Sequence, residues 1–163
     1  MHFEVTAAVG ADLPELADVA ARTFPLACPA SASDEDIATF IDESLSEPRF
    51  ADYLADPDRR VLVARADGRI IGYAMVVRSA DGVELSKIYV LPDGHGTGAS
   101  AALMTAALDA VKDLGAESVW LGVNQRNERA QRFYAKQGFT VSGTRTFRLG
   151  AGIENDYVMV RPV

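Results

Sequence analysis

Residues 84–100 have the sequence ELSKIYVLPDGHGTGAS, and this stretch decides the fold. A turn at Asp81-Gly82 leads into a predicted strand over residues 83–90. Pro92 and the glycines at positions 94, 96 and 98 then break the pattern, and an alanine-rich helical period begins at Ala99. Glycines at a helix N-terminus free backbone N–H groups to bind phosphate oxygens without a basic side chain. We therefore predict an anion-binding loop between this strand and this helix.

Three other interpretations of the loop compete with this one. Glycines also mark tight turns that bind nothing. Residues 94–99 satisfy the dinucleotide-binding pattern G-x-G-x-x-A, but that pattern belongs to a parallel unit whose next strand ends in an acidic residue. Here the loop follows a hairpin, and the strand 119–123 ends in Asn124. A Walker-type P-loop is excluded because no Gly-Lys-Ser or Gly-Lys-Thr follows.

The elements on either side of the loop are read from apolar periodicity. Before it we expect a strand at 3–8, a helix that starts after Asp12-Leu13-Pro14 and ends at Pro25, helices opening near residue 34 and at Pro48, and a hairpin of strands 61–66 and 70–77 with a turn at Asp67-Gly68. After it we expect a helix at 99–114, a buried strand at 119–123, a helix at 127–137 and strands at 139–147 and 157–160. No repeat or long linker is visible, so residues 1–163 are predicted to form a single α/β (α+β) domain, a mixed sheet with helices on its faces.

Composition excludes several classes of function. The chain has 163 residues and a formal net charge of −7, which repels phosphate backbones, so no nucleic acid is expected as a partner. No apolar run approaches the roughly 20 residues of a bilayer span, no export signal is visible, and no membrane association is expected. The single cysteine, Cys28, cannot form an internal disulfide, which fits a cytoplasmic location. No spacing of His, Cys or carboxylates fits a metal site.

A second motif follows the strand 119–123. Residues 123–139 read VNQRNERAQRFYAKQGF and match the spacing N-x-x-A-x-x-F-Y-x-x-x-G-F throughout. Together with the strand end at residues 87–92 and the glycine loop, this motif resembles the Gcn5-related N-acetyltransferase (GNAT) family from about residue 60 to 140. The resemblance implies a mixed, mostly antiparallel sheet of about six to seven strands with helices on both faces, and acetyl-CoA as cosubstrate.

The resemblance also implies which residues hold the cosubstrate. The family pattern Q/R-x-x-G-x-G/A aligns with His95, Gly98 and Ser100, so the chain departs from it at the first and last positions. Serine is small enough for close approach to a phosphate, while His95 donates a hydrogen bond without the reach of arginine. The expected pyrophosphate cradle is His95, Gly96, Thr97, Gly98, Ala99 and Ser100. The pantetheine arm and acetyl carbonyl are expected on backbone groups of Ile88, Tyr89 and Val90 and on the Asn127 side chain.

Two residues are candidates for proton transfer. The resemblance implies that Tyr134 protonates the departing CoA thiolate, and a phenol of reference pKa about 10 suits that role; the alternative is a core aromatic. Glu84 lies on the strand that leads into the loop and is the candidate base for a bound ammonium, its alternative being an exposed carboxylate. Lys87 is expected to face solvent. Cys28 has no recognisable histidine partner, so direct transfer is preferred to an acyl-enzyme.

The acceptor is predicted from weaker signals. The tail 154–159, ENDYVM, and the order of elements are similar to PaiA-like bacterial polyamine acetyltransferases, and the acidic first third of the chain would suit a cationic amine. A protein N-terminus or another small amine is the alternative acceptor. From other classes, an inactive acyl-CoA-binding sensor and a dinucleotide-binding domain remain as rival functions. A homodimer is predicted to pair through the final strand, residues 157–160.

Overall fold

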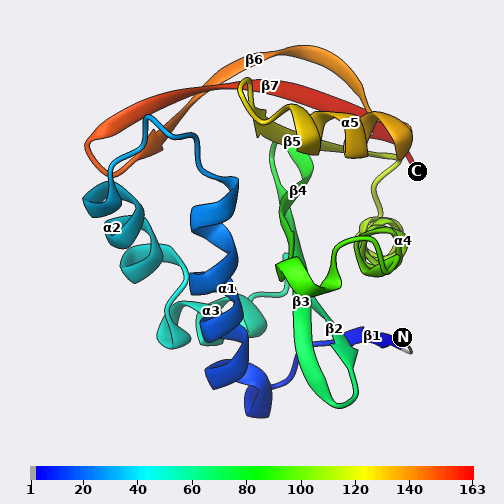
Figure 1. Cartoon of the computed structure of the whole chain (residues 1–163). Helices are drawn as coiled ribbons and strands as arrows, with labels where there is room; N and C mark the ends of the chain where they lie inside the picture. Colours follow the sequence, from blue (N-terminus) through cyan, green and yellow to red (C-terminus); the bar gives the residue numbers. More distant parts are fainter. Residues whose placement is uncertain (1–2) are drawn as a thin grey trace.

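The computed structural model describes residues 3–163, which form a seven-stranded sheet with helices against both faces (Figure 1). The strands lie in the order β1-β2-β3-β4-β5-β7-β6. Their bounds are β1 Phe3–Ala7, β2 Arg59–Ala66, β3 Arg69–Ser79, β4 Gly82–Val90, β5 Ser118–Asn124, β6 Thr140–Leu149 and β7 Gly152–Pro162. The helices are α1 Leu13–Ala27, α2 Asp34–Ser44, α3 Glu47–Ala55, α4 Ala99–Asp113 and α5 Glu128–Lys136, with short 3-10 turns η1 Gly10–Asp12 and η2 Pro92–Gly94. The predicted mixed, mostly antiparallel architecture is confirmed.

The sheet is joined in its middle by one parallel pair, β4 with β5, and that pair is short. The two strands are in register at Val83 with Val119 and at Glu84 with Trp120, and no later residues of the described strands pair. On its other edge β4 stays paired with β3 as far as Val90, opposite Gly72. The β4 edge beyond Glu84 therefore leaves backbone groups that no strand satisfies, and such groups need another partner.

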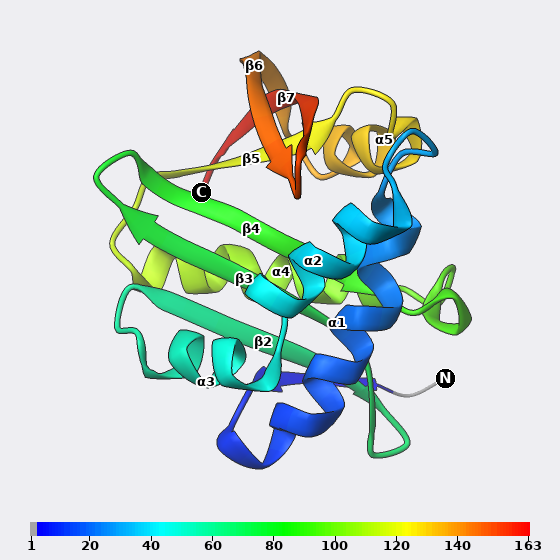
Figure 2. The ribbon, with the colours of Figure 1, turned by 90° about the vertical axis from the view of Figure 1, so that its left-hand side faces the viewer.

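Two hydrophobic cores fill the layers on the two faces of the sheet. Helices α1, α2 and α3 lie on one face and α4 on the other (Figure 2). The first core joins Leu16, Phe24 and Phe50 to strand residues such as Tyr73, and the second joins Leu103 and Met104 to Leu121. Alanines at 99, 107 and 110 let α4 approach the sheet closely, as expected of small side chains at a packed face.

Local sequence accounts for the ends of these elements. Asp67 and Gly68 take positive φ angles of 52° and 79°, the conformation that closes a two-residue hairpin between β2 and β3. Ser33 and Ser46 each accept a hydrogen bond from a backbone N–H in the first turn of α2 and α3. The hairpin and both helices were predicted, and the structure confirms them.

Three details differ from the sequence prediction. α1 continues two residues past Pro25. A proline in the last turn removes only one backbone N–H hydrogen bond, and the Pro25 carbonyl still accepts a hydrogen bond from Cys28 N–H at 3.3 Å. Asp12 makes no side-chain bond into α1; its carboxylate accepts from Val9 N–H at 2.9 Å and pairs with Arg65 at 2.8 Å. β7 is longer than predicted.

The prediction that a homodimer pairs through residues 157–160 is also wrong, because these residues do not lie at an edge of the sheet. β7 lies between β5 and β6, so both of its backbone edges are paired within the chain. The outer strand on this side of the sheet is β6, whose residues are mostly exposed. Residues 157–160 therefore offer no free edge to a second copy.

Candidate active site

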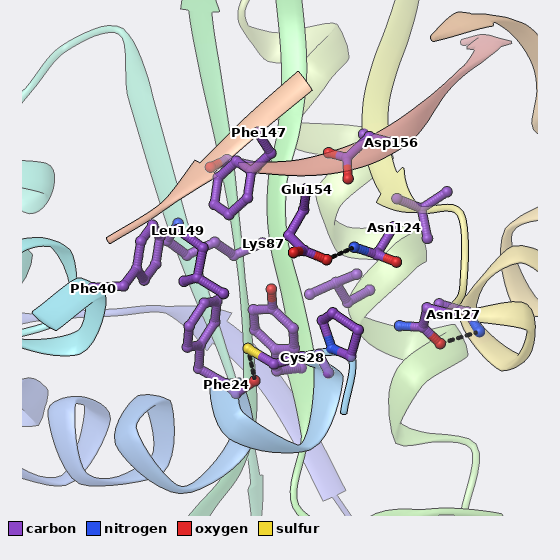
Figure 3. Close-up of a pocket in the computed structure, with 18 of the residues that line it drawn as sticks. Phe24, Cys28, Phe40, Lys87, Asn124, Asn127, Phe147, Leu149, Glu154 and Asp156 are labelled. Atoms are coloured by element: carbon purple, nitrogen blue, oxygen red, sulfur yellow. Dashed lines mark hydrogen bonds between the residues drawn. The ribbon is translucent and has the colours of Figure 1, made fainter. Parts of the chain in front are cut away.

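A cavity of about 230 Å³, here called cavity A, lies where β4 and β5 separate. The end of α1, α2, β6 and β7 complete its walls (Figure 3). Its apolar wall is aromatic: Phe24 stacks on Phe40 with ring centroids 4.4 Å apart, and Phe147 meets Phe40 edge-on at 5.6 Å. Its charged side chains are Glu84, Lys87, Arg145, Glu154 and Asp156. Cavity A suits a ligand with an apolar body and a cationic group.

A second cavity of about 200 Å³, cavity B, lies beside the glycine loop. Ile88, Tyr89, Asn127 and Tyr134 are among the residues that line both cavities. Cavity B also includes Val90, His95 and Ser100. The two cavities thus share a wall made by α5 and by the part of β4 that does not pair with β5, and four of the predicted cosubstrate residues lie on that wall.

The glycine loop has the backbone conformation expected of an anion cradle. Gly96 and Gly98 take positive φ angles of 79° and 92°, and Gly98 is the N-cap residue of α4. The Thr97 hydroxyl donates to the Gly94 carbonyl and accepts from Ala99 N–H, which fixes the loop internally. Ala99 N–H is therefore occupied, but the next N–H groups in the first turn of α4, those of Ser100 and Ala101, have no partner inside the helix and are available to an anion.

His95 does not extend from the loop as an arginine would. Its exposed ring places Nε2 3.0 Å from the Val90 carbonyl, and because that oxygen only accepts, Nε2 carries the proton in this hydrogen bond. The ring therefore ties the loop to the end of β4. Ser100 lies in the first turn of α4, on the wall of cavity B.

Asn127 and Tyr134 lie at the start and in the body of α5. The Asn127 Oδ1 accepts from Ala130 N–H at 3.1 Å and caps the helix, which leaves its Nδ2 group to donate to a ligand (Figure 3). Burial raises the pKa of the Tyr134 phenol well above its ordinary value, with a smaller contribution from Tyr89. The phenol is therefore protonated at neutral pH, the form that a proton donor requires.

Arg145 links two carboxylates in cavity A. Its guanidinium lies 3.6 Å from Glu84 and 3.3 Å from Asp156, at the closest atoms of each pair. Glu154 is held separately, by a hydrogen bond of 3.2 Å from the Asn124 amide (Figure 3). No site role was predicted from the sequence for Arg145, Asn124 or Asp156. An available signal was the i, i+2 spacing of Glu154 and Asp156, which puts both on one face of a strand.

Lys87 was expected to face solvent, and that expectation is wrong. Its side chain lines cavity A, with the ammonium 5.7 Å from the centroid of the Phe40 ring. Burial lowers the pKa of Lys87 to about 8, although Glu84 opposes the effect. The β-bulge in the β3–β4 pairing between Leu85 and Lys87 explains the error, because it changes which residues of β4 share a face.

Cys28 also lines cavity A, but as a protonated thiol. Burial raises its pKa to about 11, with a smaller effect of Glu154, and the thiol donates a hydrogen bond of 3.4 Å to the Phe24 carbonyl. A thiolate nucleophile is disfavoured here, which agrees with the prediction of direct transfer.

Two negative findings apply to residues 3–163. They contain no group of three or more His, Cys, Asp or Glu side chains arranged to hold a metal ion. None of the helices described is long and apolar enough to cross a membrane.

Comparisons with known proteins agree with one another. A model of the Acetyltransferase (GNAT) family matches residues 16–139. An uncharacterized N-acetyltransferase of Mycobacterium tuberculosis is 66% identical over 151 residues, 92% of this chain and 97% of that protein. The structure of PaiA N-acetyltransferase from Thermoplasma acidophilum, in complex with coenzyme A, covers 100% of both chains with a TM-score of 0.86 at 24% identity. The ribosomal-protein-S18-alanine N-acetyltransferase from Escherichia coli covers 99% of this chain and 94% of its own, with a TM-score of 0.74 at 21% identity.

Proposed function

This chain belongs to the acetyltransferase (GNAT) family and is an acetyl-CoA-dependent N-acetyltransferase; we propose that its acceptor is the primary amine of a small molecule bound in cavity A. The observation that carries the proposal is the shared wall of the two cavities. Tyr134 reaches both, Glu84 lies in cavity A, and the glycine loop borders cavity B. An acceptor and an acyl donor can therefore meet at that wall.

The described residues fit acetyl-CoA on three separate grounds. The first turn of α4 offers N–H groups to the pyrophosphate behind two glycines with positive φ. The unpaired edge at Ile88, Tyr89 and Val90 offers backbone groups to the pantetheine arm. Asn127 keeps its Nδ2 donor free. When bound, acetyl-CoA supplies an activated acetyl group and a thiolate that leaves.

Glu84 is the proposed proton acceptor for the amine. An acceptor that enters as its ammonium must lose a proton before its nitrogen can form the new C–N bond. The Glu84 carboxylate lies in cavity A beside β5 and takes that proton, directly or through one water. The side chain is 25% exposed, so the proton can pass on to solvent.

Tyr134 is the proposed proton donor to the leaving sulfur. When the C–S bond breaks, the thiolate needs a proton, and the phenol hydroxyl on the shared wall gives it. Burial keeps this phenol protonated at neutral pH, and the phenolate left after the transfer takes a proton back from solvent before the next turnover. A protein that only sensed acyl-CoA would have no use for this group, so Tyr134 favours an enzyme over a binding module.

The walls of cavity A favour a small acceptor over a protein N-terminus. Asp36 on α2 accepts a hydrogen bond of 3.1 Å from Ala151 N–H, in the turn between β6 and β7. Phe40, also on α2, contacts Phe147 on β6. An extended peptide that entered between α2 and the β6–β7 turn would have to displace both contacts.

The charges of cavity A favour a cationic acceptor and limit how many positive charges it can carry. Glu84, Glu154 and Asp156 outnumber Lys87 and Arg145, so one ammonium is favourably placed there. The predicted polyamine would bring further positive charge into the same space as Lys87. We therefore include polyamines in the test alongside monoamines.

Calorimetric titration with acetyl-CoA, with NADH under the same conditions, is the first test. We expect micromolar affinity for acetyl-CoA and no heat with NADH. CoA release is then followed with putrescine, spermidine, simple aromatic monoamines and a short peptide with a free N-terminus. Binding of acetyl-CoA without acetylation of any amine would reduce the protein to a sensor, and a preference for the peptide would overturn the small-molecule acceptor.

A further inference from the structure

The guanidinium of Arg145, on β6, contacts side chains of three neighbouring strands. It reaches Glu84 on β4 and Asp156 on β7, at 3.6 Å and 3.3 Å. Its Cζ atom lies 5.1 Å from the centroid of the Trp120 ring on β5, a cation–π contact. Sequence patterns could not predict this arrangement, because Arg145 and Glu84 are 61 residues apart in the chain.

Gly122 makes the arrangement sterically allowed. A Cβ atom on residue 122 would overlap Nη2, Nε and Cζ of Arg145. Any side chain at this position of β5 would therefore push the guanidinium off the Trp120 face or out of the space between the carboxylates. Gly143, on β6, has no atom within 4 Å of the equivalent Cβ, so not every glycine in this sheet region serves such a purpose.

The two carboxylates depend on the cation between them. Glu84 and Asp156 both contact the guanidinium of Arg145. Two carboxylates that share a site disfavour simultaneous ionisation unless a cation lies beside them. Asp156 is buried, with its side chain 7% exposed, and desolvation raises its pKa while Arg145 lowers it. Without Arg145, Asp156 would tend to take up a proton and Glu84 would lose its anchor.

We propose that Arg145 is a positioning residue: it holds the Glu84 carboxylate in place facing cavity A, the Trp120 ring supports its guanidinium, and Gly122 leaves the space that the guanidinium occupies. This inference rests on the proposed function, in which Glu84 takes the proton of the acceptor amine. Arg145 lines cavity A, but it neither takes nor gives a proton in the proposed reaction. Its effect reaches the reaction through Glu84.

The pH dependence of this arrangement involves every titratable group that lines cavity A. Glu84 and Lys87 come from β4, Glu154 and Asp156 from β7, Tyr134 from α5 and Cys28 from the end of α1, with Tyr89 beside them. Lys87, Cys28, Tyr89 and Tyr134 titrate well above the carboxylates. A shift in the acid limb of a rate profile therefore reports on the carboxylates next to Arg145.

The test uses Arg145→Gln, Arg145→Lys and Gly122→Ala, with Gly143→Ala as the matched control. The acid limb of kcat/KM is measured against pH with the best amine found in the panel. Loss of the cation that contacts both carboxylates is expected to move that limb upward in Arg145→Gln. Gly122→Ala moves it in the same direction, Arg145→Lys leaves it nearer its original position because the charge is kept, and Gly143→Ala leaves it unchanged.

Trp120 provides a reading that needs no turnover, because it is the single tryptophan of the chain. Its emission is expected to change alike in Arg145→Gln and Gly122→Ala, which both remove the stacked cation, and to stay constant in Gly143→Ala. Acetyl-CoA affinity, measured by calorimetry, should stay within about twofold in every variant that folds, since the cradle is formed by other residues.

The outcomes separate the two proposals. Turnover with an unshifted acid limb in both Arg145→Gln and Gly122→Ala would overturn the positioning role. Identical Trp120 emission in all variants would overturn the geometry on which it rests. A wild-type protein that binds acetyl-CoA but acetylates no amine, while its Trp120 emission still responds to the substitutions, would overturn the proposed function and with it the role of Glu84.

Discussion

Replacing Tyr134 by Phe removes one hydroxyl from the wall shared by cavities A and B and keeps the ring. The ring contacts Phe133 and Phe139 at centroid distances of 5.6 Å and 5.9 Å, and the phenyl group of the variant can keep both. No hydrogen bond to another described residue contributes to the pKa of this phenol. The free energy of unfolding is therefore expected to change by less than about 0.5 kcal/mol.

The expected loss is in turnover. General acid catalysis typically contributes a factor of about 100 or more, so kcat should fall by about two orders of magnitude, equivalent to about 2.7 kcal/mol in the barrier. Acetyl-CoA affinity should stay nearly unchanged, because the cradle and the β4 edge are intact. Because burial raises the pKa of this phenol, the wild-type rate should show no alkaline limb from Tyr134 below about pH 10.

The assay is steady-state CoA release with a saturating amine, beside a calorimetric titration of each variant. Tyr53→Phe is the matched control, since its hydroxyl donates to the Ser44 carbonyl at 2.8 Å within the α2–α3 layer and lines neither cavity A nor cavity B. Tyr53→Phe should lose about 1 kcal/mol of stability and keep its kcat. A Tyr134→Phe variant with kcat within twofold of wild type would refute the assignment of the leaving-group acid.

Three further expectations follow from other parts of the structure. Gly98→Val should weaken acetyl-CoA binding by at least about tenfold in calorimetry, because a β-branched residue is strained at a φ of 92° and would crowd the phosphate approach; equal affinity would place the cradle elsewhere. Lys87→Met should raise kcat/KM for putrescine several-fold, and much less for a monoamine, by removing like charge from cavity A; an equal effect on both amines would contradict this. Asp12→Asn should lower the free energy of unfolding by about 2 kcal/mol in urea, because it breaks the ion pair with the partly exposed Arg65. Desolvation works to raise the pKa of Asp12, but the Val9 N–H and Arg65 prevail and lower it, so this contribution is present above about pH 4 and is lost as pH falls through the folded-state pKa; a wild type that loses no more stability than Asp12→Asn on acidification would argue against it.

Local sequence was enough to predict most elements of the fold. The Asp67-Gly68 turn, the glycine loop and the α5 motif each encode their backbone conformation within a few neighbouring residues, and the structure has all three where predicted. The residues expected to hold the cosubstrate could be located from the same signals, because β4, the glycine loop and α4 are consecutive in the chain and α5 carries its own motif. The roles of these residues stay predictions.

What the sequence could not indicate lies between strands that are distant along the chain. Lys87 was predicted to face solvent because the alternation of side chains along a strand was assumed to be regular. A bulge in β4 interrupts that alternation, and the sequence does not show where the bulge lies. The edge at residues 157–160 was misplaced because strand order is set by packing, and β7 inserts between β5 and β6. Neither feature leaves a local signature in the residues concerned.

By itself, the sequence determined the class of fold and the family of chemistry, because turn glycines, helix caps and the two motifs act over short distances. Only the tertiary structure decided the charge pattern of cavity A, since its charged side chains come from three strands that are distant along the chain: Glu84 and Lys87 from β4, Arg145 from β6, and Glu154 and Asp156 from β7. The physical reason is that a Coulomb interaction depends on separation in space and on burial. Neither is fixed until the strands have paired and the Arg145 guanidinium lies against Gly122.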